Sequence, residues 1–144
     1  MDSPEGSFYR FSLKSKKAKK IGTSGTTVTN AEQNGKYFVL SDGTGAGYSY
    51  LGVYNAAKGK FRKIANLPKA PVNWHVTKKY VYFAEVINGY SYNPPYRVRI
   101  RRYTFSSGKT KTLVKSLKVK YVNSFSSDGV TYTAPSGTTK VKKW

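Results

Sequence analysis

His75 is the only histidine of the chain and the residue best suited to acid–base chemistry. An internal repeat aligns it with Glu32 and Phe125, and an imidazole beside a carboxylate can hold a metal ion or transfer protons. His75 also follows Trp74, so a hydrogen-bonded structural histidine is the alternative, and the favoured one. We therefore expect no catalytic residue and no metal site.

Other catalytic signatures are missing from the sequence. The chain has no cysteine, which excludes thiol catalysis and thiolate metal sites. It also lacks a Gly-rich phosphate loop that opens a helix, a nucleophile elbow and a paired Cys/His motif. We expect a non-enzymatic protein without a cofactor. A hydrolase or lyase that acts on an acidic polysaccharide at His75 and Glu32 is the least favoured alternative.

Tyrosines gather in two segments that the repeat makes equivalent. Aromatic side chains on loops above a rigid scaffold are suited to recognising a sugar or a peptide, although they can also pack locally over strand ends. The two segments should lie on the same side of the molecule. The candidate ligand-binding residues are Tyr48, Tyr50, Tyr90, Tyr92, Tyr96, Trp74 and His75.

Positive charge is the second source of candidate sites, because 26 Lys and Arg oppose 6 Asp and Glu, a formal net charge of +20. A field of this size attracts polyanions. Several of the basic residues recur at every second position, which places them on one face of a strand. In one such strand Val98 and Ile100 should face the core and the arginines should face outward. The candidate polyanion-binding residues are Lys58, Lys60, Arg62, Arg97, Arg99, Arg101, Lys109 and Lys111.

The kind of polyanion is suggested by the 20 Lys and 6 Arg, because an ammonium group suits diffuse contact with phosphate better than base reading. This Lys-, Thr-, Ser- and Tyr-rich composition is typical of secreted or wall-associated proteins of Gram-positive bacteria. We therefore expect a binding or scaffold module for anionic polymers at a cell surface, with a cytoplasmic location as the alternative. A nucleic-acid-binding protein, with tyrosines as stacking platforms, is the alternative function.

The elements that must position these residues come from a segment that recurs three times. Each copy is an aromatic residue, a short polar turn and a Lys-rich stretch that ends in an aliphatic residue, which is typical of a β-hairpin. A second set of matching stretches opens at Asn30, Asn73 and Asn123, with steps of 43 and 50 residues. Each unit therefore holds about four strands. The three hairpins are expected at 11–21, 54–64 and 103–113.

The units are out of phase with the ends of the chain. We expect one domain, 1–144, whose third unit has only its first two strands at the carboxy terminus and is completed by an amino-terminal hairpin. Lys16 stands where the other two hairpins have Gly59 and Gly108, so a different or looser turn is expected there. The expected parts are the hairpin 8–21, two four-stranded units at 26–67 and 70–116, and the incomplete unit 119–144.

These hairpins resemble the repeats of bacterial TolB-like β-propellers, in Tyr54-x4-Gly59-Lys60-x3-Ile64 and Tyr103-x4-Gly108-Lys109-x3-Leu113. The turns Asn34-Gly35-Lys36 and Asp128-Gly129 before hydrophobic strands add to the resemblance. The resemblance covers nearly the whole chain and implies an all-β fold of three four-stranded blades. It implies little about function.

Three blades do not close comfortably around an axis, because propellers usually have four to eight. A homodimer that forms a six-bladed ring is the favoured architecture. A β-trefoil and a fragment of a larger propeller are the alternatives. No apolar run is long enough to span a membrane as a helix. Residues 1–7 do not resemble a signal peptide, so an exported protein would have lost its signal.

Overall fold

The computed structural model describes residues 6–23, 28–44 and 47–144. Residues 1–5, on which part of the signal-peptide expectation rests, lie outside the described residues, as do 24–27 and 45–46. All elements of the described part are β-strands, so the predicted all-β class is confirmed. Within the described ranges, no helix has the length and apolar character needed to cross a membrane.

Two four-stranded antiparallel sheets form the middle of the molecule, and each follows the strand order of the sequence. The first sheet contains β3 (Asn30–Asn34), β4 (Tyr37–Thr44), β5 (Gly47–Asn55) and β6 (Lys60–Asn66). The second sheet contains β7 (Pro71–Val76), β8 (Tyr80–Tyr90), β9 (Asn93–Thr104) and β10 (Lys109–Val119). The hairpins predicted at 54–64 and 103–113 are the turns from β5 to β6 and from β9 to β10.

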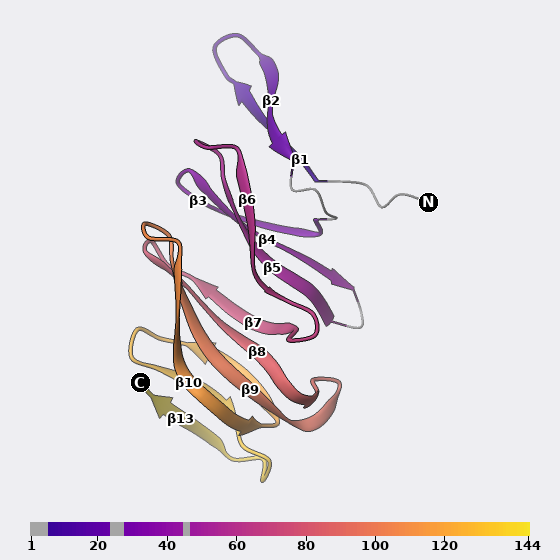
Figure 1. Cartoon of the computed structure of the whole chain (residues 1–144), viewed down its shortest axis with the longest axis vertical. Coiled ribbons are helices and arrows are strands. Elements are labelled where there is room, and N and C mark those ends of the chain that lie inside the picture. The colour runs from indigo at the N-terminus through magenta and orange to yellow at the C-terminus, as the bar shows by residue number, and fades with distance from the viewer. Residues whose placement is uncertain (1–5, 24–27, 45–46) are drawn as a thin grey trace.

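Smaller sheets lie at the two ends of this stack (Figure 1). The amino-terminal hairpin pairs β1 (Ser7–Ser12) with β2 (Lys17–Thr23). The carboxy-terminal sheet contains β11 (Tyr121–Phe125), β12 (Gly129–Thr133) and β13 (Thr139–Lys143).

Within this chain the amino-terminal hairpin does not complete the last unit, and completion by the hairpin of a second copy stays a prediction. β13 pairs along the edge of β12 that the hairpin was expected to take, and the hairpin lies at the opposite end of the molecule. β13 escaped prediction because its sequence, TKVKK, has one apolar residue and every position is exposed. The described residues close neither a barrel nor a ring.

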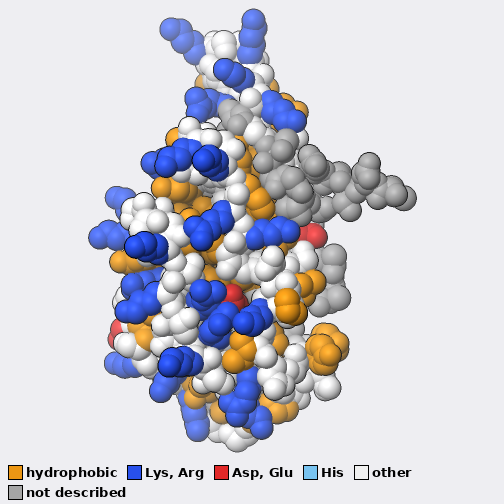
Figure 2. Space-filling view, in the orientation of Figure 1, with side chains coloured by type: hydrophobic (Ala, Val, Ile, Leu, Met, Phe, Trp, Pro, Cys, Tyr) orange, Lys and Arg blue, Asp and Glu red, His pale blue; other side chains and the backbone are white. Residues whose placement is uncertain are grey.

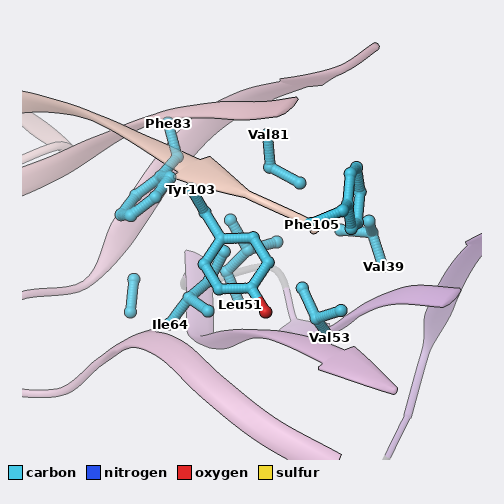
Figure 3. Packing of buried hydrophobic residues seen from close by; sticks show 9 residues of the cluster. Val39, Leu51, Val53, Ile64, Val81, Phe83, Tyr103 and Phe105 are labelled. Carbon is cyan, nitrogen blue, oxygen red and sulfur yellow. The ribbon is translucent and has the colours of Figure 1, made fainter. Parts of the chain in front are cut away.

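Three clusters of buried apolar side chains lie between neighbouring sheets and pack them together. β4 shows why, because adjacent Val39 and Leu40 point to opposite faces and enter different clusters. Tyr103 points from β9 toward Leu51 and Val53 of the first sheet, and Phe105, just after β9, lies beside Val39 in the same cluster (Figure 3). The middle sheets are thus buried on both faces, which explains their nearly continuous apolar runs.

Two asparagine side chains join neighbouring sheets at intervals of one repeat. Asn34 Nδ2 donates to the carbonyl oxygens of Thr77 and Lys78, both at 3.2 Å. Asn73 Nδ2 donates to those of Val122 at 3.0 Å and Asn123 at 3.3 Å. Each bond links positions that the repeat makes equivalent or adjacent, so the sheets follow one another with a regular offset.

The turn of the amino-terminal hairpin has a residue in the left-handed backbone conformation, as the other two hairpin turns do. Lys16 has a φ of 53°, beside 63° for Gly59 and 66° for Gly108. The expectation of a different turn is therefore wrong for this residue. A side chain with a Cβ occupies the left-handed region at this position, where glycine avoids the steric cost.

Candidate functional site

Two grooves lie near opposite ends of the strands in the middle sheets. The turns β5–β6 and β9–β10 lie at one end of their sheets, and the β8–β9 turn, the end of β4 and the start of β5 lie at the other, as the meander order requires. The first groove is basic and the second is rich in tyrosine. The two are therefore separate candidate sites.

The basic groove consists of two hollows of about 560 and 440 Å³ between the first and second sheets. The hollows share Arg62, Ser107 and Gly108, and a hydrogen bond of 2.7 Å from Arg62 Nη1 to the Gly108 carbonyl ties the two sheets together there. None of the described residues that line them is acidic. The lining cations are Lys58, Lys60, Arg62, Lys63, Arg101 and Lys109.

Glu85 is the only buried carboxylate among the described residues, and it lies behind this groove with 3% of its surface exposed. Its Oε2 accepts hydrogen bonds from Arg99 Nε at 2.9 Å and Nη2 at 2.6 Å. Its Oε1 accepts a longer one, of 3.4 Å, from Arg101 Nη1. One carboxylate thus faces two guanidinium groups, so the trio keeps a net positive charge, and Arg101 carries part of it into the groove.

The structure brings five of the eight candidate polyanion-binding residues into the basic groove: Lys58, Lys60, Arg62, Arg101 and Lys109. Arg97 and Lys111 are exposed elsewhere, and Arg97 donates to Ser116 Oγ at 3.1 Å. Val98 and Ile100 are buried as expected. The expected outward direction is wrong for Arg99 and Arg101, which turn toward Glu85 in the seam between the sheets.

Lys63 lines the basic groove but was absent from the candidates. It does not follow the period of two set by Lys60 and Arg62, because Arg62 and Lys63 pair with the adjacent residues Val53 and Gly52 and so alternate across β6; the register of β5 with β6 shifts only after Lys63. The adjacent pair Arg62-Lys63 was the available signal. Figure 2 shows further Lys and Arg side chains over most of the visible face, with few acidic ones.

The tyrosine groove joins two hollows of about 310 and 200 Å³, which share Tyr48, Pro71, Val72 and Ser91. The larger hollow also contains Tyr90 and Tyr92, and the smaller one contains Tyr96 and Tyr121. The start of β5 and the segment around the β8–β9 turn therefore do bring their tyrosines together. None of the described residues that line either hollow is charged.

Ring contacts hold several of these tyrosines in place. Tyr90 and Tyr92 stack with centroids 5.3 Å apart, although both remain largely exposed. Tyr48 meets Trp74 edge to face at 4.5 Å. Tyr96 is buried, and burial raises the pKa of its hydroxyl, partly offset by a hydrogen bond with the backbone of Val122. Tyr48 and Tyr96 are thus packed against their neighbours, whereas the stacked rings of Tyr90 and Tyr92 form an exposed aromatic platform.

The remaining candidates lie outside the tyrosine groove. Tyr50 is a core residue with 1% exposure, and burial, with a smaller contribution from the Asp42 charge, raises its pKa to about 12. Trp74 contributes through its contact with Tyr48. His75 is exposed on β7, and Glu32 is exposed on β3 of the neighbouring sheet. Tyr121 and the lining prolines were missed because they lie outside the two predicted loops.

Clusters suited to metal binding are not found in the described part of the chain, where no three His, Cys, Asp or Glu residues gather. Comparison of the sequence with models of known protein families finds no match, and comparison with curated proteins finds none either.

Proposed function

We propose that this protein is a non-enzymatic binding module for an anionic polymer, and that the basic groove is the contact surface. The observation that carries the proposal is the convergence of six Lys and Arg side chains on two joined hollows with no acidic residue among their described lining. Like charges that line one groove repel one another, and a bound polyanion relieves this repulsion.

Phosphate is the favoured charged group of the polymer. Both hollows are open grooves, so they can follow a flexible chain of anions. Lysine ammonium groups make unselective point-charge contacts with phosphate, whereas Arg62 and Arg101 supply guanidinium forks for tighter pairing. We further propose a phosphate polymer of a Gram-positive cell wall as the natural ligand, and a cell-surface location, from the Lys-rich and cysteine-free composition.

The architecture that supports this role is, in our proposal, a TolB-like propeller in which each sheet is a blade. The support is the repeated antiparallel order of the middle sheets, the asparagine bonds one repeat apart and the face-to-face cores between the sheets. We propose that a second copy closes the ring, because apolar side chains are exposed at both ends of the stack. They are Tyr9, Phe11 and Leu13 at one end and Val141 at the other.

The test is binding of the full chain to poly(glycerol phosphate) and to duplex DNA of equal phosphate concentration, at several salt concentrations. Lys60→Gln with Lys109→Gln removes two exposed cations of the basic groove. The matched control, Lys140→Gln with Lys142→Gln, removes the same charge from exposed positions on β13. We expect the groove variant to lose about tenfold or more in affinity for the polymer and to show a shallower salt dependence, since fewer counterions are released.

Equal losses in the groove and control variants would show that net charge alone drives binding, and would refute the groove as the contact surface. Tighter binding to DNA than to the polymer at every salt concentration would favour the nucleic-acid alternative. Breakdown of an acidic polysaccharide that His75→Ala abolishes would instead establish the hydrolase or lyase alternative.

A further inference from the structure

The tyrosine groove differs from the rest of the surface in its charge. The chain carries 26 Lys and Arg, yet neither hollow has a charged residue among its described lining. A lining of tyrosine, proline, serine and aliphatic side chains does not attract the anionic polymer proposed for the basic groove. It requires a ligand whose bound part is uncharged.

The shape of the groove favours an extended ligand. Tyr48, Pro71, Val72 and Ser91 belong to both hollows, so the groove continues from the platform of Tyr90 and Tyr92 to Tyr121 on the carboxy-terminal sheet. It thus crosses the second sheet and reaches both of its neighbours. A compact ligand would fill one hollow, whereas an extended chain can occupy both.

The chemistry of the lining separates a peptide from a sugar. Sugar hydroxyls are best satisfied by carboxylate and amide side chains, and no Asp, Glu, Asn or Gln is among the described lining residues. A polyproline helix instead offers apolar rings and carbonyl oxygens, which suit stacked tyrosines and hydroxyl donors. Aromatic-lined grooves bind such segments because the polyproline conformation is already ordered before binding.

We propose that the tyrosine groove is a second binding site, for an extended proline-rich peptide segment with uncharged residues at its centre and acidic residues at its ends. Rings of the ligand lie against the Tyr90–Tyr92 platform and Tyr48, and tyrosine hydroxyls donate to its carbonyl oxygens. The acidic ends follow from the field of the protein, since a net charge of +20 attracts a negatively charged partner to a neutral groove.

The experiment titrates the full chain with a hexaproline peptide that has two Asp residues at each end, and follows backbone amide shifts by NMR. A peptide with six alternating Gly and Ser residues between the same Asp ends is the charge-matched control, and chitohexaose is the sugar probe. Tyr90→Ala with Tyr92→Ala removes the exposed platform. Tyr9→Ala is the matched control, because Tyr9 is equally exposed on the distant amino-terminal hairpin.

We expect the proline peptide to bind at least tenfold more tightly than the Gly/Ser peptide, with shifts in β5, β7, β8, β9 and β11. The platform variant should lose at least tenfold in affinity for the proline peptide, while Tyr9→Ala keeps it and both variants retain binding to poly(glycerol phosphate). Equal affinity for the two peptides, an unchanged affinity in the platform variant, or binding of chitohexaose without the proline peptide would overturn the proposal.

Discussion

At the scale of single residues, the seam between the middle sheets depends on Glu85. Its two oxygens accept bonds from Arg99 and Arg101, whose side chains are each 25% exposed. The same face of β8 carries Val81 and Phe83 into the apolar cluster shared with the first sheet. Glu85, Arg99 and Arg101 thus lie next to the apolar cluster on the same face of the second sheet, and the one carboxylate is, among the described residues, the only anion that offsets the two arginines.

Glu85→Gln should destabilise the fold strongly. The variant keeps the shape of the side chain but leaves two guanidinium groups without their anion. Loss of one partner from a buried pair costs several kcal/mol, so we expect about 2–4 kcal/mol of unfolding free energy after allowance for the partly exposed arginines. Urea denaturation measures the loss. Glu32→Gln, at an exposed position, should stay within about 0.5 kcal/mol of the parent, and an equal effect of the two variants would contradict this role.

At the scale of elements, the three related hairpins differ at one turn position. Gly59 and Gly108 take the left-handed backbone conformation without steric cost, and Lys16 takes it with a Cβ. The contact of Arg62 with the Gly108 carbonyl also makes the β9–β10 turn part of the link between sheets. The amino-terminal hairpin has the least favourable turn residue of the three.

Lys16→Gly should therefore stabilise the amino-terminal hairpin. Relief of the left-handed strain outweighs the extra freedom of glycine in the unfolded chain, for a net gain of about 0.5–1 kcal/mol. Hydrogen exchange of the β1 and β2 amides should slow by several-fold. Lys14→Gly makes the same change in charge at a neighbouring position without a positive φ, and should not slow exchange. Equal slowing in both variants would assign the effect to charge rather than to backbone conformation.

At the scale of the whole molecule, exposed apolar surface favours the association of two copies and the net charge opposes it. The stack exposes apolar side chains at both ends, among them Leu13 at 86% exposure, and such surfaces favour association. A net charge of +20 keeps copies apart. At 0.1 M, salt screens the repulsion between exposed charges that are more than about 10 Å apart, and it leaves apolar contacts largely unchanged.

Self-association should therefore strengthen as salt rises, whereas polymer binding weakens. We expect light scattering to give the mass of a single chain, 16.1 kDa, at low ionic strength and twice that mass at high ionic strength. Phe11→Ser with Leu13→Ser should prevent the change, because it removes exposed apolar area without altering charge. A single-chain mass at every salt concentration would exclude the two-chain ring.

The sequence by itself determined what depends on local chemistry. Alternating apolar runs and the turns at Gly59 and Gly108 define the two middle sheets, because hairpins form between neighbours along the chain. The tertiary structure decided what each face meets. Arg99 and Arg101 follow the pattern of outward residues but face another sheet and Glu85, and Tyr50 is buried while Tyr48 lines a groove. Both faces of a middle sheet are covered, so the alternation of residues along a strand does not show whether a side chain faces solvent or a neighbouring sheet. The position of β13 depends on its pairing with β12 and not on its own composition.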